Sequence, residues 1–522
     1  MISVLSDNRK GVPRKGYNEN RRRARGEALA AAAGSGSPVW SPCADAASNP
    51  PDGRPDHEKK SVLIQPVRQP PDRVTAVPQP RHRSRSRTEI LVYNPWPDRS
   101  RKLLITVSSA IAILALFLAL KSYGATELLA QYRTFLLMLT AAGLGVWVMP
   151  RKLLQDRRFQ VFLLIGAFLL FQSWWLNTLE ARGYILLSLG WVTAFLILAL
   201  SWQNATAIRL ISIFLILAGS LEALYGLVQS LGGVDYIGSY QRDVGSLATG
   251  TFINPNHFAG FLNMVIPFAM GALVAGFTIR RRRRPYTHSE AYAWGWIILL
   301  ACAFMGLAVL LSQSRGGAVS LAASLLLMGI LLFLKKRRGG ALSGWSISIL
   351  IALTIGLSAW VGVNTLLERF GQVEVDLPTR LRVYQATVEM VSDYPLFGVG
   401  PGMFGWRFRP YQTGRSDTLF LHTHNDYLQT VAEWGIPAAL VFWIFVLWRL
   451  RGAIRTSLVS LDPWTQGIAL GCAGAMTALL LHSLVDFNLQ IPANWMIFSL
   501  ILALSWVIEV YEASFEPGMR RV

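Results

Sequence analysis

Residues 363–426 form a long polar segment between two apolar runs, and this contrast decides how the chain folds. Within the segment stand LPTRLRVY (residues 377–384), DYPLFGVGPG (residues 393–402) and HTHNDY (residues 422–427). No other polar insertion of this length interrupts the apolar runs of the chain. We therefore predict that residues 363–426 are a large loop that stands outside a membrane.

The composition favours a membrane protein. Hydrophobic residues make up 52% of the 522 residues and charged residues only 15%, a fraction that soluble proteins rarely show. The 18 tryptophans suit a protein with an aromatic belt at each membrane surface. The three cysteines have neither metal nor disulfide spacing, and we predict no metal site and no cofactor.

Apolar runs recur along the chain from residue 101 onward. About 20 residues cross a hydrocarbon core about 30 Å thick, and helices are the spanning elements that satisfy their own backbone. We predict an all-α polytopic membrane protein with about 12 transmembrane helices. The runs cover residues 103–120, 134–149, 159–176, 184–201, 209–230, 258–278, 293–311, 317–334, 343–362, 427–447, 467–485 and 491–510.

The first 100 residues differ from the rest, and we predict two regions, 1–100 and 101–522. The first is rich in Arg, Pro, Ser and Ala, with charge runs at residues 21–25 and 81–87, as in a disordered cytoplasmic tail. A nucleic-acid-binding arm is one interpretation. The simpler one is a tail held near anionic lipid, each cation contributing roughly 1 kcal/mol.

The basic residues, which give a formal net charge of +20, indicate the orientation. With the N-terminus inside, every basic cluster falls in a cytoplasmic gap, so we predict that both termini are cytoplasmic. Residues 363–426 then lie on the periplasmic side, with 231–257, 312–316 and 486–490. The clusters are Arg151 to Arg158, Arg280 to Arg284, Lys335 to Arg338, Arg449 to Arg455, and Arg520 with Arg521.

Two outward segments carry candidate binding residues at the starts of apolar runs. Asn254, Asn256 and His257 either cap a helix or hold hydroxyls or an anion at its N-terminus. Arg315 lies in a very short outward link, against the positive-inside rule. It either snorkels to lipid headgroups or clamps a diphosphate, since a guanidinium pairs two oxygens at once.

The large loop carries further candidates. Arg380 and Tyr384 are four residues apart and would share one face of a helix, whereas Arg382 would point elsewhere. His424 stands beside Asn425, just before the next apolar run. A histidine there is either a structural hydrogen-bonding residue or a general base.

Polar residues near or within the apolar runs complete the candidates. His482 and Asp486, at positions i and i+4, would pair on one helical face and either orient a catalytic group or pin two helices. Glu222 lies inside a run, where a carboxyl group is expensive in lipid, and is predicted to face the bundle interior and to bind substrate.

No P-loop, Gly-x-Ser-x-Gly or His-Glu-x-x-His motif occurs, and no Asp-x-Asp pair of the kind that holds a sugar nucleotide through a metal. A cytosolic nucleotide-sugar donor is therefore disfavoured. A donor that is already activated and membrane-borne fits better.

Seven stretches together resemble the O-antigen ligase and Wzy-type polymerase superfamily of bacterial polysaccharide assembly. They fall in order around the large loop and cover roughly residues 210 to 505. The chain departs from many relatives in having Leu247-Ala248-Thr249, without an arginine, before Gly250. The matching stretches are Leu221 to Gly226, Gly250 to His257, Ser314 to Gly317, Arg380 to Tyr384, Pro395 to Gly402, His424 to Leu428 and His482 to Pro492.

The resemblance implies a metal-independent, inverting glycosyltransferase of the bacterial inner membrane. Its donor would be a glycan on a polyprenyl diphosphate, such as undecaprenyl diphosphate, and its acceptor a glycan or lipid A core. Arg315 and Arg380 match arginines thought to hold the diphosphate, and His424 matches the histidine thought to engage the acceptor. The expected partners are the bilayer and other polysaccharide-assembly proteins, with no nucleic acid.

Three functions remain to be compared. The first is a ligase or polymerase for lipopolysaccharide or exopolysaccharide, two activities that differ only in the acceptor. The second is a transporter or flippase of lipid-linked sugars, which should show related halves and polar breaks at mid-membrane, neither of which is visible. The third is a scaffold that anchors an assembly complex through its basic tail.

Overall fold

The computed structural model describes residues 98–149, 151–175, 188, 190–198, 205–282, 288–337, 373–412 and 419–515. The predicted tail, residues 1–100, lies outside these ranges apart from its last three residues. The apolar run at 343–362 also lies outside them, and the run at 184–201 is described only at 188 and 190–198.

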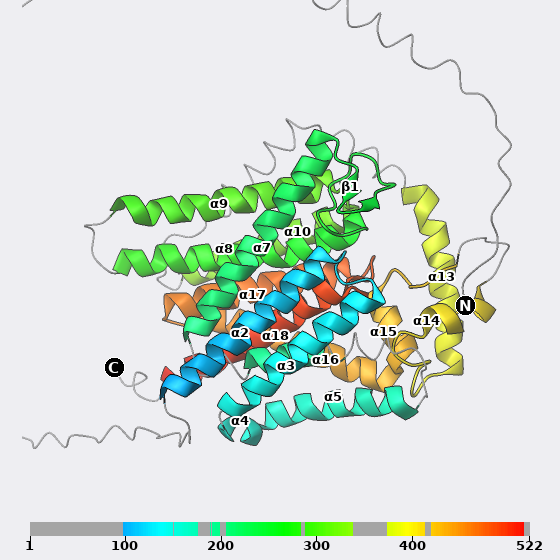
Figure 1. The fold of residues 1–522 in the computed structure, drawn as a ribbon, viewed down its shortest axis with the longest axis horizontal. Helices are drawn as coiled ribbons and strands as arrows, with labels where there is room; N and C mark the ends of the chain where they lie inside the picture. The colour runs from blue at the N-terminus through cyan, green and yellow to red at the C-terminus, as the bar shows by residue number, and fades with distance from the viewer. Residues whose placement is uncertain are drawn as a thin grey trace, which may run out of the picture. The chain divides into compact units, whose positions relative to one another are not determined.

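The described residues are almost entirely helical (Figure 1), which confirms the predicted all-α class. The long helices are α2 (Asp98–Lys121), α3 (Leu128–Val148), α5 (Arg157–Trp175), α7 (Ala205–Gly232), α8 (Pro255–Arg282), α9 (His288–Leu311), α10 (Arg315–Arg337), α13 (Val373–Asp393), α16 (Ile436–Val459), α17 (Pro463–His482) and α18 (Pro492–Phe515). The short ones are α4 (Arg151–Gln155), α14 (Phe404–Arg407), η1 (Arg409–Tyr411), α15 (Asp426–Trp434) and η2 (Asn488–Gln490). An antiparallel pair, β1 (Tyr236–Ile237) and β2 (Tyr240–Gln241), follows α7.

Within the described ranges, eight helices are long and apolar enough to cross a membrane, and two shorter apolar helices cover Phe159–Gln172 and Gly295–Leu311. The eight belong to α2, α3, α7, α8, α10, α16, α17 and α18. A polytopic membrane protein is therefore confirmed, whereas the count of 12 spans stays a prediction.

The apolar run predicted as one span at 427–447 is wrong in its boundaries. α15 ends at Trp434 and α16 begins at Ile436, because Gly435 between them has φ +79°, a conformation that favours glycine. Hydrophobic content alone cannot reveal such a break. A separate short helix, α15, therefore follows residue 426, and the predicted bounds of the polar segment, 363–426, stay a prediction.

The C-terminal end of the same span also differs from the prediction. α16 continues to Val459, so Arg449 lies within the helix and is buried instead of standing in a cytoplasmic loop. Its Nη1 lies 2.6 Å from Glu509 Oε2, and its Nη2 donates to the Ser505 carbonyl at 2.8 Å. A buried arginine needs such a partner, and the partner comes from α18, 60 residues later.

α8, α17 and α18 form the centre of the bundle. The apolar windows of these helices are 100%, 78% and 89% buried, against 28% for α2, which therefore lies at the periphery. α8 and α17 approach closely because glycines face each other. A Cβ on Gly271 would lie 2.3 Å from the Gly467 carbonyl oxygen and 2.6 Å from Gly471 Cα. Small residues at such a crossing let backbones meet, as is usual between membrane helices.

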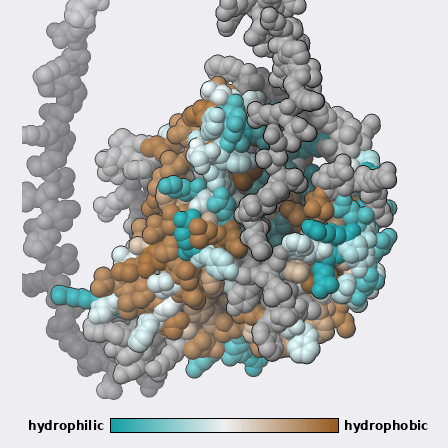
Figure 2. Space-filling model, turned by 45° about the vertical axis from the view of Figure 1, so that its right-hand side comes forward, coloured by the Kyte–Doolittle hydropathy of each residue, from teal (hydrophilic) through white to brown (hydrophobic). Residues whose placement is uncertain are grey.

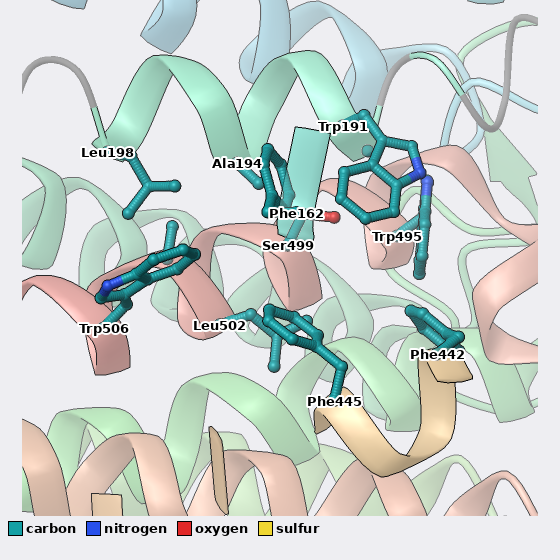
Figure 3. A pocket seen from close by; sticks show the side chains of 12 residues that line it. Phe162, Trp191, Ala194, Leu198, Phe442, Phe445, Trp495, Ser499, Leu502 and Trp506 are labelled. Atoms are coloured by element: carbon teal, nitrogen blue, oxygen red, sulfur yellow. The ribbon is translucent and has the colours of Figure 1, made fainter. Parts of the chain in front are cut away.

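Aromatic side chains fill the space between α5, residues 190–198, α16 and α18. The Phe162 ring packs at a tilt against Trp191 with ring centroids 4.2 Å apart, and the Phe442 ring packs at a tilt against Trp495 at 5.8 Å. Figure 3 shows these rings around a small cavity that Ser499 also lines. The contacts tie α5 to α16 and α18 through apolar packing.

The outer surface of the bundle is hydrophobic over wide areas, as Figure 2 shows in brown, while hydrophilic side chains gather toward the right of that view. Exposed leucine, isoleucine, valine and phenylalanine side chains follow one face of α5, α7, α10 and α16. A helix with this pattern has lipid as its solvent on that face.

Residues 373–412 and 419–434 form a unit that we call the cap. Figure 1 shows its helices α13, α14 and α15 together at one end of the bundle. The cap has its own apolar core, so the polar segment is a folded structure where it is described. The core residues are Val383, Ala386, Met390, Val399, Phe404, Phe408 and Ala432.

Candidate functional site

The candidate site is centred on Asp486, in the connection between α17 and α18. Its side chain is 1% exposed, and three imidazoles surround it. His257 Nε2 and His424 Nδ1 lie 3.8 and 3.9 Å from its Oδ1, and His482 Nε2 lies 3.9 Å from its Oδ2. The structure thus brings together three of the predicted histidines around one carboxyl group.

The three histidines come from separate helix ends. His257 lies in the first turn of α8, His424 just before α15, and His482 at the last residue of α17. The Phe487 ring packs between His257, His422 and His424, with centroid distances of 4.6, 4.3 and 4.8 Å. His422 is therefore part of the same cluster, although no role was predicted for it.

Several buried polar atoms of the cluster have no hydrogen-bond partner among the described residues. They are His257 Nε2, His424 Nδ1, His482 Nδ1, both carboxylate oxygens of Asp486, Asn488 Nδ2 and Asn494 Oδ1. A buried polar atom without a partner costs about 1–3 kcal/mol, so natural proteins keep few of them. Their concentration around one carboxylate indicates a site that receives water or a polar ligand.

His424 is held in a left-handed backbone conformation, with φ +56°. Tyr384, on α13, donates its hydroxyl to the His424 carbonyl at 3.1 Å. Asn425 caps α15 by accepting from the Leu428 N–H at 3.0 Å, and its Nδ2 donates to the Leu484 carbonyl. Strain of this kind persists only where neighbours impose it and is concentrated at functional sites.

The charge state of His424 follows from its surroundings. Its side chain is 34% exposed, so the ring is reachable from outside the bundle. Burial, together with the positive charge of Arg380, lowers the pKa of His424 to about 4. Burial raises the pKa of Asp486 to about 7, although the Phe487 N–H and Arg380 act in the opposite direction. His424 is therefore neutral at neutral pH and able to accept a proton.

Of the two arginines predicted to bind the diphosphate, Arg380 reaches this cluster, and Arg315 begins a helix that packs against it. Arg380 donates from Nη1 to the carbonyl of Val485, the residue before Asp486. Arg315 is the first residue of α10, and a Cβ on the following Gly316 would lie 2.6 Å from Val485 Cγ2. α13 therefore brings a cation next to the segment that carries the buried carboxylate, and α10 begins beside the same segment.

Arg382 lies apart from this cluster. Its Nη2 donates to Thr379 Oγ1 at 3.3 Å, and its side chain is exposed on the opposite face of α13 from Tyr384. The separation agrees with the spacing argument, but the structure does not bring Arg382 to the site where substrate binding was predicted.

Glu222 faces the bundle interior, as predicted, and holds a loop. It accepts hydrogen bonds from the Thr251 N–H and hydroxyl, both at 2.8 Å. Gln229, two turns further along α7, donates to the Gly250 carbonyl at 2.8 Å. A Cβ on Gly250 would lie 2.4 Å from Glu222 Oε2, and φ is +56° there, so the close approach requires glycine.

The two asparagines of the segment before α8 differ in their roles. Asn254 accepts the Asn256 N–H at 2.8 Å, and its carbonyl accepts the Phe258 N–H, so it caps α8. Asn256 is half-buried one residue before His257. Their predicted contacts with substrate stay predictions.

Sequence reasoning missed two buried charged residues. Asp426 accepts from Ser483 Oγ at 2.7 Å and from the Leu489 N–H at 3.2 Å, and so clamps the segment that carries Asp486. Burial raises its pKa well above the usual range. An acidic residue after an asparagine cap is the signal that could have identified it.

The second missed residue is Arg242, after β2. It donates to the Leu247 carbonyl at 2.6 Å and to the Val234 carbonyl at 2.5 Å, and so shapes the loop before α8. Within the described ranges, no group of three or more His, Cys, Asp or Glu side chains is arranged to hold a metal ion.

Residues 300–443 match the family model Wzy_C, described as O-antigen ligase. The matched stretch holds Arg315, Arg380 and His424, whereas His257 and Asp486 lie outside it. Comparison with curated proteins gave no significant match. The family acts in bacterial polysaccharide assembly as glycosyl-transferring membrane enzymes with lipid-linked glycan substrates. Over residues 300–443, and in its membrane helices, the chain is therefore similar to O-antigen ligases.

Proposed function

We propose that the protein transfers a glycan from a polyprenyl-diphosphate donor to an acceptor hydroxyl, as a ligase or polymerase of cell-surface polysaccharide. The observation that carries the proposal is the buried Asp486 carboxylate beside the accessible imidazole of His424, with Arg380 on the adjacent backbone. A base, an orienting carboxylate and a cation are the groups that this transfer requires.

Arg315 and Arg380 would hold the diphosphate of the donor. The leaving diphosphate gains negative charge as the anomeric C–O bond breaks, and fixed guanidinium groups stabilise that growing charge more than the ground state. Both arginines are half-buried, and electrostatic interactions are stronger there than in bulk water.

His424 would take the proton of the acceptor hydroxyl. Its Nδ1 faces Asp486, which leaves Nε2 to accept the proton while the hydroxyl oxygen attacks the anomeric carbon. The electron pair of the broken bond leaves with the diphosphate, and attack from the opposite face inverts the configuration. The negative charge of Asp486 would stabilise the imidazolium that forms, and no metal is needed to balance the step.

His257 and His482 share the carboxylate with His424 and would orient it from the other sides. The polar cluster lies where α8 begins and α17 ends, instead of at mid-membrane, which favours the transferase over a transporter. In this proposal the enzyme lies in the inner membrane, both termini are cytoplasmic and the cap is periplasmic. An accessible tag at Tyr411 would test that orientation.

The test uses the purified protein, a polyprenyl-diphosphate oligosaccharide and either a second donor molecule or lipid A core. Elongated lipid-linked chains identify a polymerase, glycosylated lipid A core a ligase, and translocation without bond formation a transporter. A chelator in parallel reactions tests metal independence.

A pair of variants on α13 gives the matched control. Arg380→Ala should lower the rate by about 10²–10³, the usual loss on removing one charge-stabilising donor. Arg382→Ala, on the exposed face of the same helix, should leave it unchanged. His424→Ala should cost about 10²–10⁴. Full activity of both Arg380→Ala and His424→Ala would overturn the assignment.

A further inference from the structure

The turn between α13 and α14 is one of several places where the cap exposes large apolar side chains. Leu396 is 62% exposed and Phe397 47% exposed. An exposed apolar pair on a soluble surface would need no explanation. Here, the position of Leu396 and Phe397 against the membrane helices explains their exposure.

Backbone contacts fix this turn against the cap-side ends of α5 and α16. The Ile436 N–H donates to the Pro395 carbonyl at 2.8 Å, and Gln172 on α5 donates to the Phe397 carbonyl. A Cβ on Gly435 would lie 2.2 Å from the Leu396 carbonyl oxygen. The turn therefore has a fixed position along the axes of both helices, which we call its height in the bundle.

The height can be estimated along α5. Thirteen residues separate Phe159 from Gln172, which is about 20 Å at a rise of 1.5 Å per residue. The hydrocarbon core is about 30 Å thick. Since Arg157 marks the basic end of α5, the Phe397 backbone lies about 10 Å short of the far side of the core.

α16 gives a second estimate. Trp448 and Arg157 line the same surface groove, so they lie at a similar level. From Trp448 to Ile436 is 12 residues, or about 18 Å. The next exposed residue beyond Trp448 with a charge is Arg451, so the apolar length of α16 cannot extend far in that direction. The missing hydrocarbon thickness lies on the cap side of Ile436.

Exposed apolar side chains also lie on both helices close to the turn. Leu440, one turn along α16 from Ile436, is 54% exposed, and Trp175 at the cap-side end of α5 is 64% exposed. Trp175 lies three residues beyond Gln172, at the level expected for an aromatic belt.

We infer that Leu396 and Phe397 insert into the hydrocarbon of the leaflet on the cap side and contact acyl chains. The inserted turn anchors the end of α13 to the bilayer, while the face of α13 that carries Arg380 and Tyr384 meets the polar site. This inference does not depend on the proposed reaction.

The test places a solvatochromic amino acid, by genetic encoding, at Leu396 or Phe397 in the full chain. The purified protein is reconstituted alone into nanodiscs with or without brominated acyl chains. Leu440 is the lipid-facing control, and Glu389, exposed on α13, is the water-facing control.

We expect blue-shifted emission at Leu396 and Phe397 that brominated acyl chains quench to the same extent as at Leu440. Emission like that of Glu389 would overturn the inference, as would blue-shifted emission that bromine does not quench, because that result means burial against protein. Two neighbouring probe positions guard against one variant that fails to fold.

Discussion

Gly271→Ala tests the close contact of α8 and α17, on which the geometry of the site depends. The added Cβ would lie 2.3 Å from the Gly467 carbonyl oxygen and 2.6 Å from Gly471 Cα. Ordinary contacts are about 3.5–4 Å, so the two helices must separate by about 1 Å. Backbone atoms on both sides leave no flexible side chain that could yield.

The expected cost follows from that displacement. Overpacking a close contact costs about 1–3 kcal/mol, while replacing a helical glycine by alanine returns about 0.5–1 kcal/mol. Gly271→Ala should therefore destabilise the protein by about 1–2 kcal/mol. Because α8 carries His257 and α17 carries His482, a shift of about 1 Å should also lower transfer activity by about 100-fold in the molecules that remain folded.

The assay compares Gly271→Ala with Gly276→Ala on the same helix, where an added Cβ meets nothing within 4 Å. Thermal unfolding in nanodiscs, followed by tryptophan fluorescence, should show a lower midpoint for Gly271→Ala and an unchanged or higher one for Gly276→Ala. Transfer activity is then measured well below both midpoints. A Gly271→Ala protein as stable and as active as the wild type would contradict this account of the α8–α17 contact.

Two further predictions concern the site and a helix cap. Because the pKa of Asp486 is raised to about 7, the carboxylate that supports His424 becomes protonated as pH falls through 7, and the transfer rate should fall with it. The Asp486→Asn variant should transfer slowly at every pH, and its pH–rate profile should lack this fall below pH 7. The free energy of unfolding should change with pH in the opposite direction. Burial of the charged carboxylate destabilises the folded state above pH 7, and this destabilisation decreases as pH falls toward 4. In the Asp486→Asn variant, unfolding experiments should show a weaker dependence of stability on pH. Asp462→Ala should lower the free energy of unfolding by about 1 kcal/mol, because the Asp462 carboxylate accepts a hydrogen bond from the Thr465 N–H at 2.8 Å at the start of α17. Asp462→Asn should keep the wild-type stability in the same unfolding assay.

The fold class and the polar unit at one end could be predicted from the amino-acid sequence. Low charge and long apolar runs leave helices as the spanning elements, since lipid offers the backbone no hydrogen bonds. The i, i+4 spacing placed Arg380 and Tyr384 on one face of α13 and Arg382 on another, as the structure has them. These features are local, so spacing and composition are sufficient to predict them.

Which helix ends meet could be learned only from the three-dimensional arrangement of the helices. His257, His424 and His482 are up to 225 positions apart in the sequence, and no periodicity relates them to Asp486. Their assembly depends on α8 and α17 crossing at glycines and on Asp426 clamping the segment before α18. The break at Gly435 was hidden for a related reason. The apolar content of a segment indicates whether it can lie in lipid or in a protein core. The backbone angle and the packing partner at each end of the segment depend on residues far away in the chain.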